Sequence, residues 1–146
     1  MKRMLCSLVL LVTMSTMGLL VESKSASAGP ITFTELEPAL QSSEWEGTWE
    51  EHEYFNSGPA KLFLTIMGAD VVYVEFQMFD TGMGDYTFDV SGTINGNTMT
   101  LTTRRSKAVL RLYKKNGVLE LRGDYDVFGG EYAGETGTYY FKIKKE

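Results

Sequence analysis

The stretch of sequence that decides the fold runs from Tyr86 to Asp126 and reads YTFDVSGTINGNTMTLTTRRSKAVLRLYKKNGVLELRGDYD. Apolar and polar residues alternate along it, and Asn95-Gly96 and Asn116-Gly117 interrupt the alternation. Asn-Gly between alternating runs is typical of a β-hairpin, because a two-residue type I′ turn needs positive φ at both central positions. The stretch therefore predicts two successive hairpins, each closed by an Asn-Gly turn.

Further alternating runs on both sides of this stretch extend the pattern to eight strands. Many short strands joined by local turns predict an all-β fold, and we expect an eight-stranded antiparallel up-and-down barrel. A two-layer sandwich stays open as the alternative, because both folds use the same alternation. Before the strands, Pro38 suits the first position of one short helical turn over residues 38–41. The strands are expected at residues 48–55, 61–67, 71–79, 86–94, 98–103, 108–113, 118–127 and 136–144.

One face of almost every expected strand is apolar, which suits a sheet closed around its own core. The opposite face carries mostly charged and polar side chains, Glu120 and Arg122 among them. The predicted inward set is Leu62, Leu64, Ile66, Val72, Val74, Phe76, Met78, Phe88, Val90, Ile94, Met99, Leu101, Leu110, Leu112, Leu119, Leu121, Tyr125, Tyr139, Phe141 and Ile143.

Connection lengths predict a cup. Tight turns are expected near Gly68 and at the two Asn-Gly pairs, and longer connections at residues 56–59, 80–85, 104–107 and 128–135. Alternate connections of a meander fall at opposite ends, so the longer loops should ring one mouth. The first strand enters from the tight-turn end, and we expect residues 38–43 to plug that end.

The N-terminal segment predicts export. Lys2 and Arg3 precede a largely apolar run over residues 5–21, and the small-residue site Ala26-Ser27-Ala28 follows. This is the layout of a secretory signal peptide, here residues 1–28; a transmembrane anchor is the weaker alternative. We expect a secreted or periplasmic protein without a membrane span after cleavage, with a lead-in over residues 29–44 and a barrel domain over residues 45–146.

Composition excludes several function classes. Cys6 is the single cysteine and would leave with the signal peptide, which excludes disulfides, thiol catalysis and cysteine-ligated metals from the mature chain. The formal net charge is −5. An acidic chain of this kind is a poor ligand for nucleic acid and for anionic membranes, so we expect no nucleic-acid partner.

The first strand opens with Gly47-Thr48-Trp49. This resembles the G-x-W that begins the first strand of lipocalins and, as Gly-Thr-Trp, of avidin-type proteins. With the eight-strand meander, the chain resembles a small calycin-type barrel. The resemblance implies that Trp49 packs across the barrel floor. It does not imply biotin binding, because avidin-type sites use tryptophans on later strands and none follows Trp49 here; the T-D-x-x-x-x-Y pattern of many lipocalins is also missing.

Three groups of residues are candidates for chemistry. Glu51 and Glu53 should point inward if Trp49 does, and buried carboxylates suit acid–base work, but a solvated strand end is the favoured interpretation. The carboxylates of residues 80–85 and 131–135 match no calcium-loop spacing, so we predict no metal and no cofactor. Residues 104–107 form a basic segment at the mouth that could receive an anionic head group.

Two hypotheses about function remain. The favoured one is a non-enzymatic binding protein that takes a small apolar or amphipathic ligand through the mouth. The alternative is a fully packed barrel that binds a protein partner through its mouth loops, as an inhibitor or envelope-associated factor would. A cavity above roughly 300 Å³ would favour the first. The candidate ligand-binding residues are Trp49, Glu51, Glu53, Phe76, Phe88, Arg104, Arg105, Leu112, Tyr125 and Tyr139.

Overall fold

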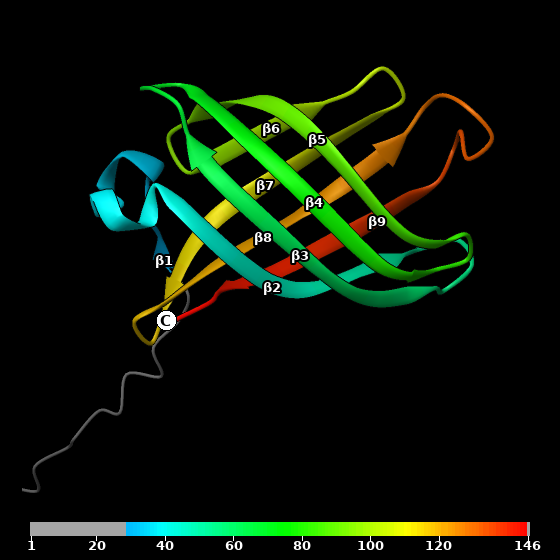
Figure 1. Ribbon diagram of the computed structural model, residues 1–146, viewed down its shortest axis with the longest axis horizontal. Coiled ribbons are helices and arrows are strands. Elements are labelled where there is room, and N and C mark those ends of the chain that lie inside the picture. Colours follow the sequence, from blue (N-terminus) through cyan, green and yellow to red (C-terminus); the bar gives the residue numbers. More distant parts are fainter. Residues whose placement is uncertain (1–28, 146) are drawn as a thin grey trace, which may run out of the picture.

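Eight antiparallel strands pair in chain order and close on themselves, as the computed structural model of the protein shows for residues 29–145 (Figure 1). Each strand pairs with the next, and β9 also pairs with β2, which completes the ring. The barrel strands are β2 (Ser42–Glu51), β3 (Ser57–Ile66), β4 (Val71–Thr81), β5 (Gly84–Asn95), β6 (Thr98–Thr102), β7 (Ser106–Lys115), β8 (Val118–Val127) and β9 (Thr136–Ile143). The predicted all-β, eight-stranded up-and-down barrel is confirmed, and the sandwich is excluded.

The lead-in covers the tight-turn end of the barrel (Figure 1, left). It contains the short strand β1 (Gly29–Pro30), which pairs with β7, and two 3-10 turns, η1 (Phe33–Glu35) and η2 (Pro38–Leu40). Phe33 is only 2% exposed, and its N–H donates to the carbonyl oxygen of Gly96 over 3.0 Å. The expected helical turn at Pro38 is confirmed, whereas η1 and its buried phenylalanine form the part of the plug that the sequence pattern did not reveal.

Of the two predicted Asn-Gly turns, one is confirmed and one differs from the structure. Asn116 and Gly117 both have positive φ, so this type I′ turn is confirmed. At the first hairpin Asn95 pairs with Thr98, and the central residues are Gly96 and Asn97, of which only Gly96 has positive φ. That pattern is typical of a type II′ turn. The shift by one residue pairs Ile94 with Met99, both of which point inward.

The expected loop over residues 80–85 is also wrong. β4 continues to Thr81 and β5 begins at Gly84, with a register shift between Met78 and Thr81. Two residues then connect the strands. The mouth is therefore formed by this tight hairpin together with the connections over residues 52–56, 103–105 and 128–135.

The predicted inward residues are all buried or partly buried, so the alternation identified the core correctly. The floor position differs from the resemblance: Trp45 pairs with Leu62 and Ile143 near the plugged end and is fully buried. Trp49 lies further along β2, toward the mouth, where its indole N–H donates to the carbonyl oxygen of Phe79 over 2.9 Å. The first strand begins at Ser42 and not at residue 48, which gives Trp45 its inward position.

Glu120 is an exception to the rule that outward-facing residues are exposed. It lies on the outer face of β8 as expected, yet it is 3% exposed because Arg122 and Tyr140 cover it.

Within residues 29–145, no helix is long and apolar enough to cross a membrane.

Candidate functional site

The mouth half of the barrel encloses a cavity of about 1140 Å³. Strands β2, β4, β5, β6, β7, β8 and β9 contribute inward side chains to it, and the mouth loops surround its opening. The plugged half of the barrel is filled instead, by Trp45, Leu62, Leu64, Val72, Val74, Met99, Leu110, Leu112, Leu121 and Phe141. The interior is therefore neither hollow throughout nor packed throughout.

Aromatic rings form the layer between the packed half and the cavity. The rings of Phe76 and Phe88 stack with centroids 5.0 Å apart, and the ring centroid of Phe76 lies 5.1 Å from that of Tyr139. Tyr139 in turn lies 4.8 Å from Tyr125. Four strands contribute these rings, which hold one another in place and give the cavity a rigid apolar base.

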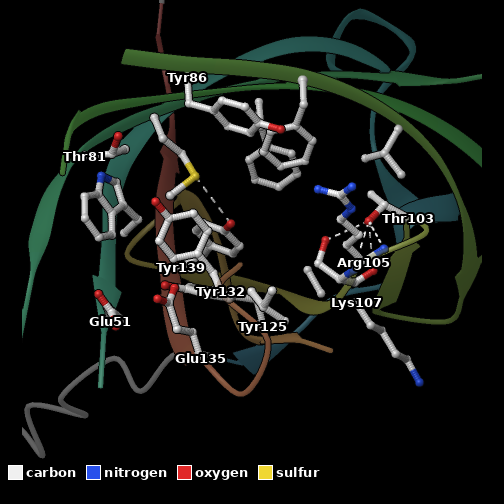
Figure 2. A pocket seen from close by; sticks show the side chains of 18 of the residues that line it. Glu51, Thr81, Tyr86, Thr103, Arg105, Lys107, Tyr125, Tyr132, Glu135 and Tyr139 are labelled. Carbon is white, nitrogen blue, oxygen red and sulfur yellow. Dashed lines mark hydrogen bonds between the residues drawn. The ribbon is translucent and has the colours of Figure 1, made fainter. Parts of the chain in front are cut away.

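One side of the cavity is acidic. Glu51 ends β2 and Glu135 ends the connection before β9, and Figure 2 shows both carboxylates on the same side, away from Arg105. Burial, followed by the negative charges of Glu51 and Glu53, raises the pKa of Glu135. Burial, followed by the charges of Glu51 and Glu135, raises the pKa of Tyr125 to about 12. The local potential is therefore negative.

The basic turn between β6 and β7 lies on the other side. Thr103 Oγ1 accepts from the N–H groups of Arg105 (3.1 Å) and Ser106 (2.9 Å), which orders the turn. The carbonyl oxygen of Arg105 accepts from the N–H of Phe128 over 2.8 Å, which ties this turn to the β8–β9 connection. Arg104 and Arg105 line the cavity but are exposed, so water solvates both guanidinium groups.

Eight of the ten candidate residues from the sequence line the cavity: Trp49, Glu51, Phe76, Phe88, Arg104, Arg105, Tyr125 and Tyr139. Glu53 does not point inward, because β2 ends at Glu51 and Glu53 lies exposed in the following turn. Leu112 is inward but belongs to the packed half, beside the plug. Strand alternation identifies the inward face; it does not tell where along the strand the cavity begins.

Several lining residues were not predicted. Ala108 faces the cavity from β7, and the small size of its side chain leaves space there. Met83 and Glu135 come from mouth connections, where no periodicity indicates direction. Tyr132 donates its hydroxyl hydrogen to Met83 Sδ over 2.7 Å, a contact between two connections (Figure 2).

Among the described residues, no group of three or more His, Cys, Asp or Glu side chains is arranged to hold a metal ion. His52, the single histidine, is exposed at the β2–β3 turn, where its backbone N–H donates to the carbonyl oxygen of Thr136 over 2.9 Å.

No protein-family model and no curated protein matches the sequence. The structure is similar to a redesigned beta barrel, with a TM-score of 0.52 and 13% identity over 74% of this chain and 94% of that one. It is also similar to the siderocalin Ex-FABP, with a TM-score of 0.49 and 5% identity, covering 71% of this chain and 69% of that one. Rhizavidin is a third similar structure (TM-score 0.43, 13% identity, 69% and 83%). At such identities the first likeness supports the barrel fold alone, and function is argued from the cavity of this chain.

Proposed function

We propose that the protein is an exported, non-enzymatic binding protein that holds a small apolar or amphipathic ligand in the mouth half of its barrel. The observation that carries this proposal is the cavity of about 1140 Å³ above the aromatic layer. Small-molecule sites are concave, largely pre-formed and mostly apolar, with a few polar groups that orient the ligand. Phe76, Phe88 and Tyr139 supply the apolar base, and Glu51 and Arg105 are polar groups at opposite sides.

Two sequence features support export and a non-enzymatic role. The first is the layout of residues 1–28, which is typical of a secretory signal peptide and lies outside the described residues. The second concerns nucleophilic catalysis, which needs a base within hydrogen-bond reach of a nucleophile. His52 is the one histidine of the chain and lies outside the cavity lining.

The test is native mass spectrometry of the mature protein, purified without denaturation from its own host. We expect a co-purifying small molecule, and we expect Ala108→Phe to eliminate it, because the new ring fills the cavity from β7 without burying a charge. Val109→Phe is the matched control, since Val109 is the next residue and faces outward. Thermal unfolding must show both variants folded.

A bare mass in every preparation, with no thermal shift from fatty acids or other amphiphiles, would overturn the proposal. A ligand that Ala108→Phe and Val109→Phe retain equally would place it elsewhere on the protein.

A second candidate function is binding of a protein partner at the mouth. Exposed aromatic side chains on the mouth connections favour it: Phe55 is 86% exposed, and Tyr54 and Phe128 are also exposed. The packed interior that this alternative assumed is wrong, but rim contacts do not require it. Replacing Phe55 and Phe128 together by serine should then abolish partner capture while leaving any amphiphile binding in the cavity unchanged.

A further inference from the structure

Glu51 is a buried carboxylate with one unoccupied acceptor. It is 6% exposed and lines the cavity. Its backbone N–H donates to the carbonyl oxygen of Asn56 over 2.8 Å, and Asn56 Nδ2 donates to Glu51 Oε2 over 3.2 Å. Among residues 29–145, nothing donates to Glu51 Oε1, which is itself buried. Buried polar atoms are normally hydrogen-bonded, so this oxygen marks a position where a donor is missing.

The surroundings of Glu51 favour a positively charged donor. Glu135 lies on the same side of the cavity, and burial together with the charges of Glu51 and Glu53 raises its pKa. The part of this shift that comes from Glu51 and Glu53 shows that negative charges gather on this side of the cavity, where added positive charge is favourable. A cation placed beside Glu51 would therefore be attracted by two carboxylates, of which Glu51 is buried.

Aromatic rings complete the surroundings. Trp49 and Tyr139 are buried neighbours across the β2–β9 pairing, and Tyr125 lies 4.8 Å from Tyr139. All three line the cavity with Glu51. Ring faces attract cations, most strongly where water is excluded. A carboxylate beside three aromatic residues suits an organic ammonium group.

The basic turn opposite does not offer an equally strong site for an anion. Arg104 and Arg105 are exposed, so their charges are already solvated and gain little from a new partner. Glu51 Oε1, by contrast, is desolvated whether or not a ligand is bound, and a charge-assisted hydrogen bond offsets that cost.

We propose that the ligand carries a protonated amine, which donates to Glu51 Oε1 with Glu135 beside it and Trp49, Tyr125 and Tyr139 around it, while the apolar remainder rests on the Phe76–Phe88 layer. This inference rests on the proposed function and specifies the ligand class of the same cavity.

The experiment compares decylamine, decanol and decanoate at neutral pH, below micelle-forming concentrations. The Trp45→Phe background leaves Trp49, which lines the cavity, as the reporting tryptophan. We expect decylamine to bind at least about tenfold more tightly than decanol, the size of one charge-assisted hydrogen bond. Glu51→Gln should remove that preference. Glu53→Gln is the matched control, because Glu53 is exposed and outside the lining, and it should keep the preference.

The outcomes separate the two proposals. Binding of decanol or decanoate without an advantage for decylamine would overturn the amine inference and leave the proposed function standing. An amine preference that survives Glu51→Gln would also overturn it. Failure of all three probes to bind would count against the cavity as a binding site altogether. If Glu51→Gln does not fold, Glu135→Gln takes its place and should lower the decylamine preference.

Discussion

Glu51 and Glu120 are the two buried charged residues of the described chain, and their surroundings differ. Glu120 Oε2 accepts from Arg122 Nε over 3.0 Å and from Arg122 Nη2, and Glu120 Oε1 accepts from the Tyr140 hydroxyl over 2.8 Å. Both of its oxygens are occupied, whereas Glu51 has one open oxygen. We therefore expect Glu120 to stabilise the barrel wall and Glu51 to act in the candidate ligand site.

Glu120 should stabilise the fold in a pH-dependent way. Burial by itself would raise its pKa, but the hydrogen bonds from Arg122 and Tyr140 and the charges of Arg122 and Lys142 outweigh burial and lower it. A carboxyl whose pKa is lower in the folded state stabilises it above the ordinary value of 4.5, and this contribution is lost as the pH falls through the lowered pKa.

We therefore expect Glu120→Gln to reduce the free energy of unfolding by about 1–3 kcal/mol at neutral pH, measured by urea denaturation. The difference from the native protein should shrink at acid pH, below the lowered pKa. Glu46→Gln is the control on the outer face of β2, where the exposed pairs to Lys61 and Lys144 should contribute less than about 1 kcal/mol. A pH-independent loss for Glu120→Gln would contradict the ionic explanation.

At the scale of elements, Gly47 explains why the Gly-Thr-Trp motif contains a glycine. A Cβ at position 47 would lie 1.8 Å from the carbonyl oxygen of Tyr140, a backbone atom of β9. The two strands approach closely there, where β2 passes from the plugged half to the mouth half. Only a residue without a side chain permits that approach.

Gly47→Ala should therefore destabilise the protein by at least about 2–3 kcal/mol, because the strands must separate to admit the methyl group. Gly68→Ala is the matched control in the β3–β4 turn, where a Cβ meets no atom within 4 Å. Thermal and urea unfolding of both variants measures the difference. Equal stability of the two would show that β2 and β9 separate without cost.

The lead-in that plugs one end of the barrel, with η1 and η2, should affect the stability of the fold and leave ligand affinity unchanged. Phe33 of η1 is buried against the packed half, so Phe33→Ala should lower the free energy of unfolding by about 3–5 kcal/mol. Decylamine affinity of the folded protein should stay unchanged. Glu37→Ala, exposed in the same lead-in, is the control and should change neither quantity. Weaker binding by Phe33→Ala would mean that the plug shapes the cavity.

On the scale of the whole molecule, the two halves of the barrel interior differ, and we propose that one serves stability and the other binding. The plugged half is close-packed, and the mouth half holds the cavity above the aromatic layer. Contacts in the packed half stabilise the wall that the cavity needs, since a rigid wall keeps a pocket open without a ligand.

Leu112→Ala and Phe88→Ala should separate the two halves. Leu112→Ala removes fully buried atoms and should cost about 2–5 kcal/mol of stability with decanol affinity unchanged. Phe88 is half-buried at the base of the cavity, so Phe88→Ala should cost less stability but weaken decanol binding roughly tenfold. Unfolding curves and tryptophan fluorescence titrations measure both. The reverse pattern would contradict the division.

Much of the architecture could be predicted from local patterns. The inward face of each strand follows from the period of two, and the Asn116-Gly117 turn follows from its backbone requirement. The first Asn-Gly turn could not be placed, because cross-strand pairing of Ile94 with Met99 decided the register. The 80–85 connection was misplaced for a related reason: pairing across the hairpin extended β4 and β5 through residues with weak strand propensity.

The sequence by itself determined most of the strands, their inward faces and the antiparallel meander, since all of these depend on alternation and turn chemistry between neighbours. That the meander closes as a barrel and not as a sandwich was decided by the tertiary pairing of β9 with β2. Only the tertiary structure decided that Trp45 and not Trp49 fills the floor, that Leu112 is core, and that Glu53 points away from the cavity. It also decided that Glu51 keeps an open oxygen. These features depend on where each strand ends and on which strands meet across the barrel, which neighbouring residues do not specify.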